Sequence, residues 1–224
     1  MELFHVLNRG VDKRDIFQEE IDYVRFIHDL YVFNDTVPTD ANSGKRFERH
    51  SENMDIVSPY LQRRLVDIHG WVLMKNHYHL LLSERVEGGI SLFLRKLNVG
   101  YAKYFNEKYE RQGTLFQGRT KKIRIERTAH ELYILLYIHL NPLDYLPGFK
   151  EWRERDRGVI YKNTQAAMKY LDTYRWSSFL DYCGTKNFPS IVTTSFFRSR
   201  DMRKEVSEYL RSIEIDTINE RTLE

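Results

Sequence analysis

Residues 1–127 read in the order strand, helix, strand, strand, helix, strand, and this order predicts an α+β fold. It is the order of the split β-α-β motif, so we expect a ferredoxin-like antiparallel sheet with helices on one face. Apolar residues at three- and four-residue steps indicate the helices, and short apolar or alternating runs indicate the strands. The sheet face without helices would be free for a ligand. Added C-terminal helices should follow residue 149.

Four segments have the composition of strands, with apolar or alternating residues bounded by turn-forming ones. Between the second and third, the apolar pattern breaks for only a few residues, which predicts two strands joined directly. Basic residues alternate with apolar ones in the fourth. The strand segments are residues 3–8, 65–74, 77–83 and 119–125.

Helical segments share apolar residues that recur along one face. Thr128, with Glu131 three residues later, is typical of a capping box at a helix start. That helix should end at Asn141-Pro142, because the residue before a proline disfavours helical geometry. The helical segments are residues 19–33, 91–109, 130–140, 166–171, 176–182 and 202–213.

Composition indicates a soluble globular protein, since 42% of the 224 residues are hydrophobic and 30% are charged. No apolar run approaches the roughly 18 residues of a membrane helix, so no membrane partner is expected. The N-terminal residues lack the pattern of a signal peptide. The lone cysteine, Cys183, excludes an intrachain disulfide, and a cytoplasmic location is expected. A net charge of +3 neither establishes nor excludes nucleic-acid binding.

His77 and His79 are two residues apart in a predicted strand, so their imidazoles should point to the same face. Two neighbouring imidazoles suit one metal ion. The alternative is a pair of histidines on a solvated strand face. The other histidines carry less signal. We expect His69 to be packed and His139 to be structural, and His5 gives no indication of a site.

Tyr137 and Asn141 are four residues apart at the end of a predicted helix, so they should share one helical face. A tyrosine hydroxyl can act as a nucleophile, and an asparagine amide offers a neutral oxygen ligand. The alternatives are a core tyrosine and an ordinary residue at a helix C-terminus. Tyr133, one turn earlier, is a weaker candidate for the nucleophile.

Basic residues gather in the fourth predicted strand and after the first. Alternation in the fourth strand also fits an ordinary solvated face. Contacts with nucleic-acid phosphates are the alternative, and the resemblance described below is what favours them. The candidates are Arg9, Arg14, Arg119, Lys121 and Lys122.

The run from Met74 to Leu81 resembles the His-hydrophobe-His signature of HUH single-strand DNA endonucleases. More narrowly, the chain resembles the single-tyrosine transposases of insertion sequences and, above all, the REP-associated tyrosine transposases. Several further motifs match in the same order along the chain. They are residues 8–10, Leu97-Asn98, Tyr101 with 104–106, 115–119, 137–142 and 174–179.

The resemblance implies that His77, His79 and Asn141 bind a divalent metal, Mg²⁺ or Mn²⁺. Tyr137 would attack a phosphate of single-stranded or hairpin DNA and form a 5′-phosphotyrosine. It also implies a catalytic domain over residues 1–148, with residues 149–224 as a helical extension packed on it. Stretches near 35–63 and 149–170 are longer than the usual family connections. Some relatives are dimers, so a homodimer is one expected assembly.

Other functions stay open from the sequence alone. The chain could be another HUH nickase, such as a replication initiator or a relaxase. It could be a domesticated or catalytically inactive protein that binds a DNA sequence or hairpin. A metal-dependent hydrolase using His-x-His is a weaker alternative, because it leaves Tyr137 and the basic strand unexplained.

Overall fold

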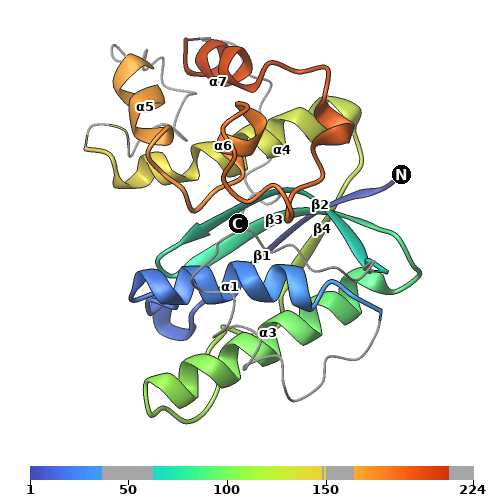
Figure 1. Cartoon of the computed structure of the whole chain (residues 1–224), viewed down its shortest axis with the longest axis vertical. Helices are drawn as coiled ribbons and strands as arrows, with labels where there is room; N and C mark the ends of the chain where they lie inside the picture. Colours follow the sequence, from blue (N-terminus) through green and yellow to red (C-terminus); the bar gives the residue numbers. More distant parts are fainter. Residues whose placement is uncertain (37–62, 148, 150–163, 212–224) are drawn as a thin grey trace.

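The computed structural model describes residues 1–36, 63–147, 149 and 164–211. Figure 1 draws these as ribbon. Of the two stretches expected to be long insertions, residues 37–62 and 150–163 lie outside the described residues. Within the described part, no helix is long and apolar enough to cross a membrane.

A four-stranded antiparallel sheet forms the centre of the fold, in the order β2-β3-β1-β4. Its first and third strands in the chain are neighbours, as the split β-α-β order requires, so the predicted α+β fold is confirmed. The register places Leu7 opposite His79 and Arg9 opposite His77. The strands are β1 (Leu3–Arg9), β2 (Val66–Met74), β3 (His77–Glu84) and β4 (Lys121–Ile125).

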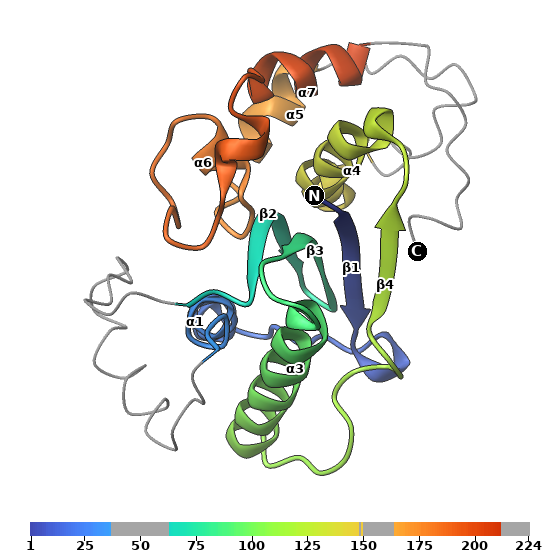
Figure 2. The ribbon, with the colours of Figure 1, turned by 90° about the vertical axis from the view of Figure 1, so that its right-hand side faces the viewer.

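Helices α1 (Glu20–Val32) and α3 (Gly89–Lys108) cover one face of the sheet (Figure 2). The larger of the two apolar cores lies between them and the strands, and it includes Trp71 and Tyr78. The Tyr78 hydroxyl donates a hydrogen bond of 2.9 Å to Asn98 Oδ1, so this buried tyrosine has its polar atom satisfied within the fold. A short 3-10 helix, Val11–Lys13, links β1 to α1.

The other face is also covered, so the expectation of a face free for a ligand is wrong. Helix α4 (Thr128–Leu140) packs on β2 and β3, where its apolar residues meet Leu3, Val72 and Leu81. α4 is apolar around most of its circumference, which is typical of a helix buried on all sides. Helices α5 (Thr164–Leu171), α6 (Phe179–Tyr182) and α7 (Met202–Arg211) lie on the same side (Figure 1).

The two ends of α4 differ in how well the sequence predicts them. Its N-cap is Arg127 and no side chain caps it, so the capping box expected at Thr128 is wrong. Its C-terminus is as predicted, because α4 ends at Leu140 and Asn141–Tyr145 continues as a 3-10 helix containing Pro142. A last 3-10 helix spans Thr194–Phe197.

Candidate functional site

Strand β3 directs its two histidines to the face that α4 covers. Side chains alternate along a strand, and Leu81, two residues after His79, packs in the α4 core. Tyr78 points the other way, into the core beneath α1 and α3. The ring centroids of His77 and His79 are 5.0 Å apart. The predicted side-by-side placement of the two imidazoles is therefore present.

A third histidine, His5 on β1, completes this cluster. Its Nε2 lies 2.9 Å from Nδ1 of His79, and the two rings stack with centroids 5.1 Å apart. Both side chains are buried. Sequence reasoning missed His5, because 74 residues separate it from His79. The alternation Leu3, His5, Leu7 and the pairing of β1 with β3 hold the signal that could have found it.

Each β3 histidine uses its Nδ1 in a contact with a neighbour. Nδ1 of His77 lies 2.6 Å from Oδ1 of Asn76, and an amide oxygen only accepts hydrogen bonds. His77 therefore carries its proton on Nδ1. His79 Nδ1 is engaged by His5. Nε2 is then the nitrogen through which each histidine could bind a metal, with a neighbour fixing the ring.

Tyr137 of α4 lies over the histidines, as a candidate nucleophile should. Its ring meets His79 and His5 edge-on, at centroid distances of 5.6 Å and 6.0 Å. Tyr133, the weaker candidate, instead has its ring against Tyr209 of α7, 5.9 Å away. Tyr137 is only 4% exposed. Its hydroxyl must become accessible before it can meet a phosphate.

Asn141 is fully buried one turn beyond Tyr137. Its Nδ2 donates a hydrogen bond of 2.7 Å to the backbone carbonyl of Tyr137. The same carbonyl also accepts the Asn141 backbone N–H, so the side chain folds back on the last helical turn, in the ordinary place weighed for Asn141 above. The amide oxygen is the atom that would ligate a metal, and that role stays a prediction.

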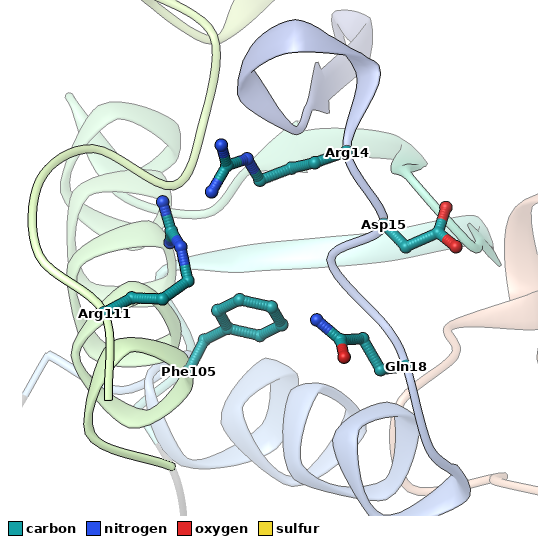
Figure 3. A pocket seen from close by; sticks show the side chains of 5 residues that line it. All are labelled: Arg14, Asp15, Gln18, Phe105 and Arg111. Carbon is teal, nitrogen blue, oxygen red and sulfur yellow. The ribbon is translucent and has the colours of Figure 1, made fainter. Parts of the chain in front are cut away.

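The five basic candidates occupy four different places. Arg9 is opposite His77 and Lys121 is opposite Leu7, so both belong to the histidine face. Lys122 turns to the other face, where its Nζ lies 5.0 Å from the Phe4 ring centroid. Arg119 is exposed in the loop before β4. Arg14 lines a separate cavity (Figure 3).

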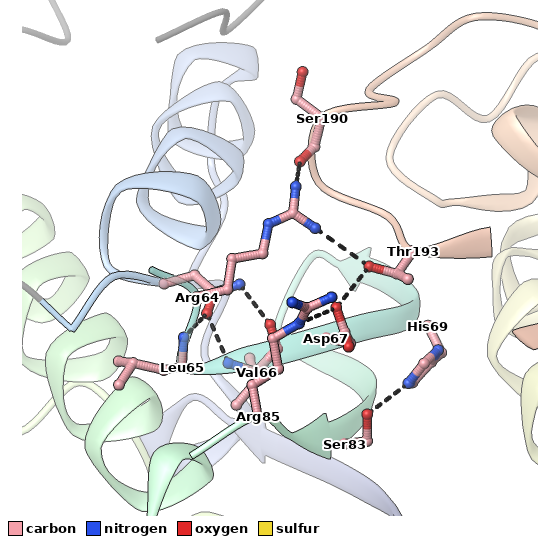
Figure 4. Close-up of polar contacts among 10 residues, drawn as sticks. Arg64, Leu65, Val66, Asp67, His69, Ser83, Arg85, Ser190 and Thr193 are labelled. Atoms are coloured by element: carbon pink, nitrogen blue, oxygen red, sulfur yellow. Dashed lines mark hydrogen bonds and ion pairs between the residues drawn. The ribbon is translucent and has the colours of Figure 1, made fainter. Parts of the chain in front are cut away.

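His139 and His69 are packed, as the sequence indicates. Nε2 of His139 lies 2.9 Å from Ser178 Oγ, and burial lowers the pKa of His139 to about 3. Nε2 of His69 lies 2.8 Å from Ser83 Oγ (Figure 4), and burial also lowers its pKa. Both imidazoles are held neutral, as structural groups of the α4 face.

The donor set fits a metal bound through two imidazoles and an amide. Across residues 1–36, 63–147, 149 and 164–211, no group of three or more His, Cys, Asp or Glu side chains is placed to hold one ion. His5 lies behind His79 and contacts its Nδ1. His5 is therefore placed to orient His79 rather than to act as a third ligand.

Comparison with known proteins gives a family for the central part of the chain. Residues 45–141 match the family described as "Transposase IS200 like". No curated protein matches. A solved structure of a REP-associated tyrosine transposase bound to a REP hairpin is similar, with 14% sequence identity and a TM-score of 0.45, over 86% of this chain and 84% of that chain. The matched segment holds His77, His79, Tyr137 and Asn141, so the family resemblance that the motifs predict is confirmed over residues 45–141.

Proposed function

We propose that this protein nicks and rejoins single-stranded DNA through Tyr137, with a 5′-phosphotyrosine intermediate. The observation that supports this most directly is the meeting of Tyr137 with His79 across two elements, at a ring-centroid distance of 5.6 Å. A tyrosine that only fills the core does not require an imidazole beside its ring. The family match covers the same residues.

In the nicking step, Oη of Tyr137 attacks the scissile phosphorus and loses its proton. The bond from phosphorus to the 3′ oxygen breaks, and that oxygen takes up a proton and leaves as a 3′-OH. Rejoining reverses the step with another 3′-OH, so no nucleotide triphosphate is consumed. A free phenol has a pKa near 10, so the attack needs charge stabilisation at the phosphate.

His77 and His79 would hold Mg²⁺ or Mn²⁺ through Nε2, with Asn141 Oδ1 as a third ligand. A bound ion supplies neutralisation of the negative charge that grows on the phosphate oxygens. Two nitrogen donors favour Mn²⁺, because Mg²⁺ prefers oxygen. The contact of 2.9 Å from His5 to His79 would keep the His79 ring in its ligating orientation.

Single-stranded or hairpin DNA is the proposed substrate. Arg9 and Lys121 share the histidine face and would hold the flanking phosphates. Arg119 and Lys122 would contact the strand farther away. We keep the catalytic domain at residues 1–148, the extension at 149–224, a cytoplasmic location and a homodimer as proposals. The ring contact between Tyr133 of α4 and Tyr209 of α7 supports the proposed packing of the extension on the domain.

A covalent-adduct assay tests the proposal. Labelled single-stranded hairpin DNA is incubated with the protein and Mn²⁺, and the products are separated on a denaturing gel. Wild type should give a band of protein-linked DNA, and Tyr137→Phe should give none. Tyr133→Phe is the matched control and should keep the band. An adduct that survives in Tyr137→Phe would show that the nucleophile is another residue.

Burial of Tyr137 supports a second candidate, a hairpin-binding protein that no longer cuts. Only 4% of Tyr137 is exposed, so little of the residue is open to a DNA strand in this conformation. Such a protein would shift a labelled hairpin on a native gel and give no adduct with any metal. The two assays on one preparation separate the two functions.

A further inference from the structure

A cavity of about 390 Å³ lies on the α3 side of the fold, apart from the histidine face. Its lining comes from the segment before α1, the end of α3 and the loop that follows α3. The guanidinium groups of Arg14 and Arg111 approach each other across it, while the Asp15 carboxylate points away (Figure 3). Gln18 and the buried Phe105 complete the lining.

Neutral groups hold both arginines. Arg14 Nε donates to the carbonyl of Val11 at 3.3 Å, and an Arg111 guanidinium nitrogen donates to Asn106 Oδ1 at 2.7 Å. Among the described residues neither arginine forms an ion pair with a carboxylate, unlike Arg25, which pairs with Asp29. Burial and then the charge of Arg14 lower the pKa of Arg111. Two like charges thus share one hollow, and an anion there would stabilise both.

The backbone before Arg14 is held in a demanding conformation. Asp12 and Lys13 have φ of 56° and 58°, in the left-handed region that non-glycine residues rarely adopt. A Cβ on Gly10 would come within 2.3 Å of the Arg14 carbonyl oxygen, so the turn requires glycine there. This turn fixes the position of the Arg14 backbone, and so the direction in which its side chain enters the cavity.

The same turn joins the cavity to the proposed active site. The Gly10 amide donates to the carbonyl of Asn76 at 2.8 Å, and Arg9 is opposite His77 on the adjoining strand. The cavity and His77 therefore lie at the same end of the sheet, on opposite sides of it. A single strand of nucleic acid that passes around this end of the sheet could contact both the cavity and His77.

We propose that Arg14 and Arg111 together bind one phosphodiester group of a nucleic-acid strand, at a site separate from the phosphate that Tyr137 would attack. Guanidinium groups present paired N–H donors that match phosphate oxygens. The Gln18 amide can donate a further bond, and Phe105 closes the floor against water. The identity of the strand as the DNA substrate rests on the function proposed above.

Salt dependence of binding tests whether the two arginines share one phosphate. The affinity of the full-length protein for labelled oligothymidine is measured in EDTA at several salt concentrations, for wild type, Arg14→Gln, Arg111→Gln and the double variant. Each single variant should bind several-fold more weakly, and the slope of log K against log salt should fall by about 0.7, the value for one single-strand phosphate. The double variant should lose no more slope than a single one.

Arg95→Gln, an exposed arginine nearer the start of α3, is the matched control and should keep the wild-type slope. A fall of about 1.4 in the double variant would mean two separate phosphates and overturn the shared site. Unchanged affinity and slope in all variants would overturn the site altogether. Thermal unfolding should show Arg111→Gln folded and no less stable, because one of two like charges is removed.

Titration with inorganic phosphate at constant ionic strength distinguishes the two possible ligands of the cavity, a nucleic-acid phosphate and a free phosphate ion. If it binds wild type but not Arg111→Gln, while oligothymidine binding is the same for both, the cavity holds free phosphate and the proposal is wrong. EDTA removes the cleavage step from these measurements. Unchanged binding in the arginine variants would therefore say nothing against the covalent adduct of Tyr137. A missing adduct would likewise say nothing against the Arg14–Arg111 site.

Discussion

The two faces of the sheet are both buried under helices, yet they carry different groups. Beneath α1 and α3 the strands present Val6, Tyr78 and Leu80, in a core of apolar and aromatic side chains. Beneath α4 the same strands present His5, His77 and His79 among Leu3 and Leu81. Strand alternation alone separates the two sets.

Two buried tyrosines make the comparison sharp. Tyr78 is 0% exposed and Tyr137 is 4% exposed. The Tyr78 hydroxyl donates a hydrogen bond to Asn98, while the Tyr137 ring meets two imidazoles edge-on. Burial therefore does not distinguish the structural tyrosine from the candidate nucleophile, but the chemistry of the neighbours does.

Of the changes considered, replacing a histidine of the α4 face should have the largest effect on activity. We expect His79→Ala to lower the nicking rate at least about 100-fold, as losses of transition-state charge stabilisation do. Hairpin affinity should change far less, because phosphate contacts come from arginine and lysine. Single-turnover cleavage and a filter-binding assay measure the two quantities.

Leu80→Val, on the same strand but under α1 and α3, is the control for general damage to β3. It should reduce the free energy of unfolding and leave nicking nearly unchanged. Equal losses of cleavage in His79→Ala and Leu80→Val would mean that His79 is only a packing residue.

His5→Phe should weaken metal binding without removing a ligand. Phenylalanine keeps the stacked ring but loses the contact with His79 Nδ1, and outer-shell losses of this kind cost about 10- to 100-fold in metal affinity. Calorimetric titration with Mn²⁺ measures this directly, without DNA. His5→Gln, whose amide oxygen can accept from Nδ1, should recover part of the affinity. Unchanged Mn²⁺ affinity in His5→Phe would remove His5 from the site.

On the opposite face, Tyr78→Phe should change stability rather than chemistry. It removes the donor from Asn98 Oδ1, a half-buried acceptor, which costs about 1 kcal/mol of unfolding free energy. The covalent adduct should form at the wild-type rate. Urea denaturation and the adduct gel together check this, and a loss of adduct in Tyr78→Phe would show that the two faces are coupled.

Local patterns in the sequence were enough to predict the sheet and its two covering helices. Alternation and helical periodicity are properties of neighbouring residues, so β1 to β4, α1 and α3 are found within a few residues of their bounds. The coverage of the second face was missed, although α4 is apolar nearly all round. A helix of that composition needs packing partners on both sides. Its apolar residues predict that packing as well as the helix itself.

The site was predictable only where its residues are close in the sequence or belong to a motif. His77 and His79 follow from a two-residue spacing, and Tyr137 with Asn141 from a four-residue spacing. His5 and Arg111 come from segments far from their partners, His79 and Arg14. Their partners are set by strand register and by the turn after β1, which no local pattern encodes.

Acid should loosen the α4 face through His139. Its Nε2 contacts Ser178 Oγ, which also accepts from the Trp71 amide at 3.0 Å, so the imidazole links α4 to β2. An unfolded histidine has a pKa near 6.5, whereas burial lowers that of His139 to about 3. Below pH 6.5 the unfolded chain binds a proton that the native state refuses.

The stabilisation from a neutral His139 is therefore full above pH 6.5 and is lost as the pH falls towards 3. One such proton changes the unfolding free energy by up to about 1.4 kcal/mol per pH unit. Urea denaturation from pH 7 to pH 4 should give a slope that His139→Gln reduces by about one proton. An identical slope in wild type and His139→Gln would mean that His139 is protonated in the folded protein, and that the link from α4 to Trp71 does not depend on a neutral ring.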